Sequence, residues 1–138
     1  MDVLERELAA MLRRIEKQLA PVMAAPLLPY CLNFVAEAYL LADRPDEAEG
    51  VVARVLEQSA VRKEQGVRAW ALWLQGSIAA RRPQPDSAAA LKAFRQALAV
   101  AEERDMRPLV AHCHLGMGEL HVAALRSAEA RDALAQAH

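Results

Sequence analysis

The sequence contains few of the residues that build β-sheets. It has no threonine, two each of Trp, Tyr and Phe, and five glycines among its 138 residues. β-Branched and aromatic residues favour strands, whereas alanine and leucine are among the strongest helix formers and supply much of the 54% apolar content. We therefore predict an all-α fold. The length corresponds to about one domain, long enough to bury a core.

The chain also lacks blocks of like charge and long apolar runs. Its 17 basic and 18 acidic side chains are interspersed, with a net charge of −1, so we expect no nucleic acid partner. No stretch reaches 18 uncharged apolar residues, and residues 1–7 are too charged for a signal peptide, so we expect no membrane association. Cys31 and Cys113 lie far apart, which favours a reducing cytoplasm over a disulfide framework.

Proline residues divide the sequence into segments with helical spacing of apolar residues. In the first segment Leu8, Leu12 and Ile15 recur at three- and four-residue intervals, and charged residues occupy the other face. Short joints at 43–44, 82–85 and 125 predict antiparallel hairpins. The predicted helices cover residues 2–19, 28–42, 45–60, 65–81, 86–103, 107–124 and 126–137.

An internal repeat relates these hairpins. The second helix of each pair carries a small–large–small pattern at i, i+4 and i+7, and successive copies are offset by 42 and 40 residues. The copies are Ala48, Val52 and Val55; Ala90, Phe94 and Ala97; Ala130, Leu134 and Ala137. A small residue also recurs in the first helices, as Ala36, Gly76 and Gly118. Leu8, Leu12 and Ile15 lie 40 residues before the first copy, so residues 2–19 occupy the second-helix position of an incomplete leading repeat.

These positions resemble the tetratricopeptide repeat. In that pattern a small residue midway along the first helix is followed three residues later by an aromatic or similar residue, here Tyr39, Ala79 and His121. Gln75, Ala79 and Leu125 depart from the pattern, and the period of 40–42 exceeds the usual length of about 34, which resembles the long-helix variety found in bacterial signalling proteins. Residues 66–76 and 106–118 are similar to the repeat region of bacterial adenylate cyclase-like and related ATPase multidomain regulators.

The resemblance implies a right-handed superhelical array of antiparallel helix pairs, a tetratricopeptide-like α-solenoid. Residues 1–138 would form one domain, with a leading helix at 1–20 and repeats at 28–60, 65–103 and 107–138. Such modules bind a protein or peptide partner on the concave face lined by the first helices. The partner-binding positions expected here are Tyr30, Asn33, Glu37, Trp70, Trp73, Ser77, His112, Leu115 and Glu119.

Trp70 and Trp73 are the strongest candidates for anchors in this groove, because aromatic residues dominate binding hot spots. A place in the core fits either tryptophan equally well. The lysine-rich clamp by which some family members hold a C-terminal carboxylate is missing, since only Asn33 comes close to it and no lysine lies at these positions.

No P-loop, GxSxG or GxGxxG motif is present, and we predict that the chain is not an enzyme and has no cofactor. His114 and His121 share a helix face but are separated by about 10 Å of helical rise, too far for one zinc ion, so no metal site is expected. There are two alternatives to a scaffold that binds a partner. One is a self-associating module that forms a homo-oligomer through its terminal helices, and the other is a C-terminal fragment of a larger bacterial signalling protein. Both rest on the stacking face around Ala130 and Leu134, which no later helix covers.

Overall fold

The computed structural model describes residues 3–22 and 28–136, and these residues form six helices and no strand. The all-α prediction is therefore confirmed for this part of the chain. The helices are α1 (Val3–Val22), α2 (Leu28–Leu41), α3 (Pro45–Arg62), α4 (Gln65–Arg81), α5 (Ser87–Glu103) and α6 (Arg107–Gln136). The predicted bounds of α4 agree with the observed ones. The predicted bounds of α1, α2, α3 and α5 differ from the observed ones by a few residues at most.

Three of the helices are followed by a residue in the same backbone conformation. Asp43, Lys63 and Asp105 adopt left-handed conformations, with φ of 60°, 57° and 54°, just after α2, α3 and α5. This conformation closes the last helical turn, and Asp tolerates it better than most residues that carry a Cβ. At the start of α5 the Asp86 carboxylate accepts a hydrogen bond of 3.0 Å from the Ala89 N–H, which caps the helix.

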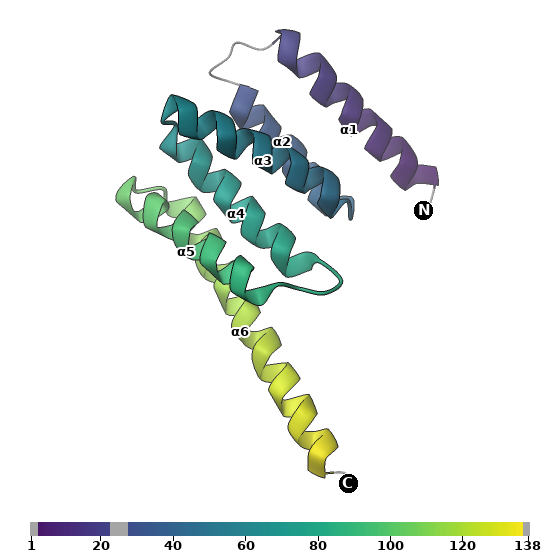
Figure 1. The fold of residues 1–138 in the computed structure, drawn as a ribbon, viewed down its shortest axis with the longest axis vertical. Coiled ribbons are helices and arrows are strands. Elements are labelled where there is room, and N and C mark those ends of the chain that lie inside the picture. Colours follow the sequence, from purple (N-terminus) through teal and green to yellow (C-terminus); the bar gives the residue numbers. More distant parts are fainter. Residues whose placement is uncertain (1–2, 23–27, 137–138) are drawn as a thin grey trace.

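Each helix packs against its neighbour in the chain, as Figure 1 shows. Alternate helices also touch, α2 with α4 and α4 with α6, whereas α3 and α5 make no backbone contact within the described residues. The first half of α6 lies against α4 and α5, and its second half projects away from the other helices (Figure 1).

Two clusters of buried side chains hold the helices together. The first joins α2, α3 and α4 around Tyr39, Val55 and Val67, and the second joins α4, α5 and α6 around Leu109 and Cys113. Both clusters include α4, which therefore sits at the centre of the molecule.

Phe94 of α5 lies between α4 and α6. A Cβ placed on Gly76 would lie 2.8 Å from the Phe94 ring, and one placed on Gly116 would lie 2.7 Å from it. Only glycine lets both helices approach the ring this closely, because any Cβ would overlap with it. Gly76 was identified from the repeat pattern, whereas Gly116 was not.

The predicted break at residue 125 is wrong, because α6 continues without interruption to Gln136. The segments 107–124 and 126–136 therefore do not form a third hairpin, and the side chains of 121–136 are all exposed. Leu125, Arg126 and Ser127 include neither glycine nor proline, so nothing in the local sequence stops the helix. Ala130 and Leu134 consequently face solvent, and Ala137 lies outside the described residues.

Candidate partner-binding surface

The strongest candidate surface lies where α4 meets α6, and its centre is a cluster of three aromatic rings. Trp70 and Trp73 pack edge to face with ring centroids 5.9 Å apart, and both rings approach His112 of α6, at 5.8 Å and 5.1 Å. One helical turn separates the two tryptophans along α4, which places them on the same side of the helix. The edge-to-face arrangement stabilises such pairs beyond their buried area.

Both tryptophans are half-buried, and they serve the core and the surface together. Their inner sides pack against the buried cluster that includes Leu109 and Cys113. Their outer parts remain accessible, as does the exposed His112 ring. The choice between core and groove that the sequence left open is therefore not exclusive.

A groove of about 350 Å³ runs between α4 and α6 beside this cluster. It gathers five of the predicted binding residues, namely Trp73, Ser77, His112, Leu115 and Glu119. The remainder of the lining is Ala80, Arg81, Phe94, Gly116, Leu120 and Ala123. The floor and walls are thus mainly apolar or aromatic, with charged groups supplied by Arg81 and Glu119, a composition typical of pockets that seat a partner side chain.

Ser77 and Asn33 are largely committed to contacts inside the protein. The Ser77 hydroxyl donates a hydrogen bond of 3.0 Å to the Trp73 carbonyl one turn earlier. The Asn33 amide donates one of 3.3 Å to the Val67 carbonyl, which joins α2 to α4. The Asn33 Oδ1 is buried and has no hydrogen-bond partner among the described residues.

Tyr30 and Glu37 extend the predicted surface onto α2. Tyr30 is 49% exposed and Glu37 is half-buried. No ring contact between Tyr30 and the tryptophans is found in the described part of the chain. The structure therefore brings together the predicted residues of α4 and α6, whereas Tyr30 and Glu37 of α2 do not line this groove.

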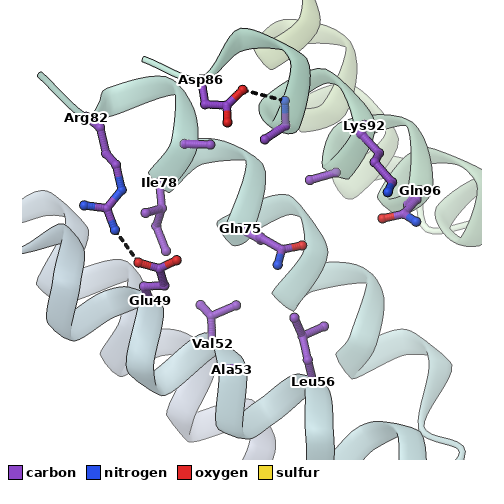
Figure 2. A pocket seen from close by; sticks show the side chains of 13 residues that line it. Glu49, Val52, Ala53, Leu56, Gln75, Ile78, Arg82, Asp86, Lys92 and Gln96 are labelled. Carbon is purple, nitrogen blue, oxygen red and sulfur yellow. Dashed lines mark hydrogen bonds and ion pairs between the residues drawn. The ribbon is translucent and has the colours of Figure 1, made fainter. Parts of the chain in front are cut away.

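A second groove, which the sequence did not reveal, lies between α3 and α5 with α4 as its floor (Figure 2). Its volume is about 660 Å³. Figure 2 shows Val52 and Leu56 of α3 on one side and Lys92 and Gln96 of α5 on the other. The signal in the sequence is the set of small residues that leaves the space open, which are Ala53, Ala79, Ala89 and Ala93.

One end of this second groove is closed by an ion-pair network. The Arg82 guanidinium donates to Glu49, as Figure 2 shows, and also to Asp46 Oδ1 at 2.9 Å, so it ties the end of α4 to the start of α3. The hydrogen bond to Asp46 raises the pKa of Arg82 above its usual value. The Arg82 side chain is therefore permanently charged, and its ion pairs have a structural role at this end of the groove.

Cys113 is the buried thiol of the second core cluster. Burial raises the pKa of Cys113 to about 11, and the negative charge of Glu102 adds to this effect. A thiol with this pKa stays protonated at neutral pH and is a poor nucleophile. His112 and His114 flank it in the sequence but are exposed, and among the residues that the structure describes no group of three His, Cys, Asp or Glu side chains could hold a metal ion.

Comparison of the chain with protein-family models, with curated proteins and with solved structures finds no match. Within residues 3–22 and 28–136, none of the helices combines the length and the apolar character needed to cross a membrane.

Proposed function

We propose that the chain is a tetratricopeptide-like repeat module that binds a protein or peptide partner through the α4–α6 groove, with Tyr30 and Glu37 of α2 as further contacts. The observation that carries this proposal is the cluster of Trp70, Trp73 and His112, which borders a groove rich in apolar lining residues. Partly exposed aromatic anchors beside a pocket are the usual centre of a protein interface.

Repeated burial along the chain supports the proposed architecture. Val67 and Ala71 of α4 are buried, and so are Leu109 and Cys113 of α6, which follow them by 42 residues. The same side of both helices thus packs against the preceding helix. Equivalent contacts at a constant sequence offset are what stacked helical repeats produce.

The lining of the groove indicates the chemistry of the partner. Trp73, Leu115 and Leu120 offer contact to an apolar or aromatic side chain. Arg81 and Glu119 offer a positive and a negative charge, and neither forms an ion pair with another of the described residues. The partner we expect is a peptide segment with a large apolar anchor flanked by charged residues. The role is that of a cytoplasmic scaffold or signalling module without enzymatic activity, metal or cofactor.

A peptide-display selection against the whole chain tests this proposal. Peptides selected with the wild-type protein should bind at least about tenfold more weakly to Leu115→Glu and to Trp73→Ala. Leu115 is 60% exposed, so its substitution leaves the fold intact, and circular dichroism checks this for both variants. Ala89→Leu, which fills part of the second groove, is the matched control and should bind normally. Selected peptides that bind all four proteins equally, or no enrichment at all, would contradict the proposal.

A further inference from the structure

The helix α1 leaves uncovered the side that its equivalents bury. Four positions are buried in α3, and the positions 42 residues later are buried in α5: Ala48, Val51, Val52 and Val55, then Ala90, Ala93, Phe94 and Ala97. Their counterparts in α1, 40 residues before those of α3, are Leu8, Met11, Leu12 and Ile15. Only Leu12 is buried; Leu8, Met11 and Ile15 are 41%, 51% and 38% exposed. In α3 and α5 the preceding helix of the same hairpin covers this side, and α1 has no such helix in the described structure.

The other end of the molecule has the complementary deficiency. In α4, Ala69, Leu72 and Gly76 are buried, and Gly76 faces Phe94 and the Ala90 carbonyl of α5. The α6 residues 42 positions later are Ala111, His114 and Gly118, and all three are exposed. A Cβ on Gly118 would meet nothing within 4 Å, because α6 runs straight on and no helix takes the place that α5 has on α4.

This uncovered side of α6 is a shallow hollow with an apolar character. Its volume is about 520 Å³, and its lining includes Leu115, Gly118 and Val122. Leu115 is 60% exposed and Val122 46% exposed. Neighbouring apolar side chains that are exposed on one helix face mark a surface that another element covers.

We infer that this face of α6 binds α1 of a second copy, so that the chain associates head to tail. In α4 and α5 a Cβ on Gly76 would lie 2.8 Å from the Phe94 ring and 3.1 Å from the Ala90 carbonyl, so the two backbones come close at Gly76 and Ala90. The equivalent intermolecular pair is Gly118 of one copy with Leu8 of the next. Leu8 is larger than Ala90, and the open space at Gly118 accommodates the difference.

Charge does not oppose this contact. Residues 3–22 contain four basic and three acidic side chains, and α6 contains three of each. The two elements therefore carry little net charge, and the apolar contact is dominant. Because the two surfaces differ, the contact is heterologous, and each copy retains one free face at each end for further copies.

Sedimentation velocity of the full chain at increasing concentration tests the inference. The average mass of the wild-type protein should rise past that of a dimer between about 1 μM and about 1 mM, the range in which weak contacts form. Met11→Glu and Gly118→Arg each place a charge in one half of the contact and should each remain monomeric over this range. Both positions are exposed, so unchanged helicity by circular dichroism confirms that each variant is folded.

Mixing the two variants gives the decisive result. Met11→Glu retains a functional α6 face and Gly118→Arg retains a functional α1 face, so an equimolar mixture should dimerise although neither variant associates alone. Leu134→Glu, a charge at an exposed position outside the contact, should associate like the wild type. A wild-type chain that stays monomeric at every concentration, a mixture that does not dimerise, or loss of association in Leu134→Glu would each overturn the inference.

Discussion

The packed middle of the molecule and its two ends are built from the same repeat pattern but differ in what that pattern contacts. In α3 and α5 the small and large residues of the pattern are buried against helices on both sides. In α1 and in the second half of α6 the equivalent side chains are mostly exposed. The difference lies in the neighbours, since a helix here is fully covered only when one helix packs on each side of it.

This contrast shows that amphipathic sequence and actual burial are separate properties. Leu134 has the sequence position of the buried Phe94, yet it is 67% exposed. Substitutions that are costly in the middle should therefore be almost neutral at the ends, although the local sequences are similar. Pairs of substitutions, one at a central and one at a terminal position where the chain offers a match, measure that difference in stability.

The largest effect is expected for Phe94→Ala. The Phe94 ring fills the space between Gly76 and Gly116, and its removal leaves a cavity that two glycines cannot fill. We expect a loss of about 3–5 kcal/mol in the free energy of unfolding, measured by urea denaturation. Leu134→Ala, the equivalent change at the end, should cost less than about 0.5 kcal/mol. Similar losses in both variants would mean that the second half of α6 is covered.

The contrast between Phe94 and Leu134 also shows how far the sequence determines the fold. Helical periodicity and proline positions located five of the helices to within a few residues, because caps and breakers are local signals. The continuous α6 was missed, since Leu125 to Ser127 suit a helix as well as a turn. The left-handed residues Asp43, Lys63 and Asp105, which follow α2, α3 and α5, are not glycines and so give no strong signal.

The candidate site was predictable in part for a related reason. The 42-residue offset placed Trp73, His112 and Glu119 on corresponding sides of α4 and α6, and the structure brings them to one groove. The groove between α3 and α5 was missed, because it depends on how far apart two helices lie. Spacing along the chain reports which face of a helix is apolar, and it does not report the distance between helices.

The next effect concerns Cys113, a core thiol in the packed first half of α6. Its pKa is raised from the usual 9.0 to about 11 in the folded protein by burial and by Glu102. The folded state therefore holds the thiol proton more tightly than the unfolded state does. The associated stability is fully present below pH 9 and is lost as the pH rises to 11, a decline of about 2–3 kcal/mol.

Denaturation at a series of pH values measures this decline. Cys113→Ala should show a shallower fall between pH 9 and pH 11 than the wild type. Cys31→Ala, which leaves Cys113 in place, should keep the wild-type decline. Equal slopes in the wild type and Cys113→Ala would show that the thiol is not protected by the fold.

Two glycine substitutions, one in each region, should change the stability of the protein in opposite directions. In Gly76→Ala the new Cβ would lie 2.8 Å from the Phe94 ring, and we expect a loss of about 1–2 kcal/mol after the gain in helix propensity is included. In Gly118→Ala the Cβ meets nothing, so the gain in helix propensity should stabilise the protein by about 0.5–1 kcal/mol. Thermal unfolding of dilute protein measures both. A loss of stability in Gly118→Ala would indicate that a helix of the same chain packs there.

The smallest effect on global stability is expected for a change that destroys local structure, Ala128→Pro. Proline breaks a helix interior at a cost of about 3 kcal/mol, yet residues 121–136 are exposed and bury no core. The broken segment should lose ellipticity at 222 nm. The free energy of unfolding of the remaining protein, measured by urea denaturation, should change by less than about 0.5 kcal/mol. Ala97→Pro, in the buried face of α5, is the contrasting variant and should unfold the protein.

Hydrogen exchange gives an independent check, because the amides of 121–136 should already exchange faster than those of α4 in the wild type. Slow exchange in this segment at low protein concentration would mean that it is covered within a single copy, and the division between a packed middle and uncovered ends would then be wrong.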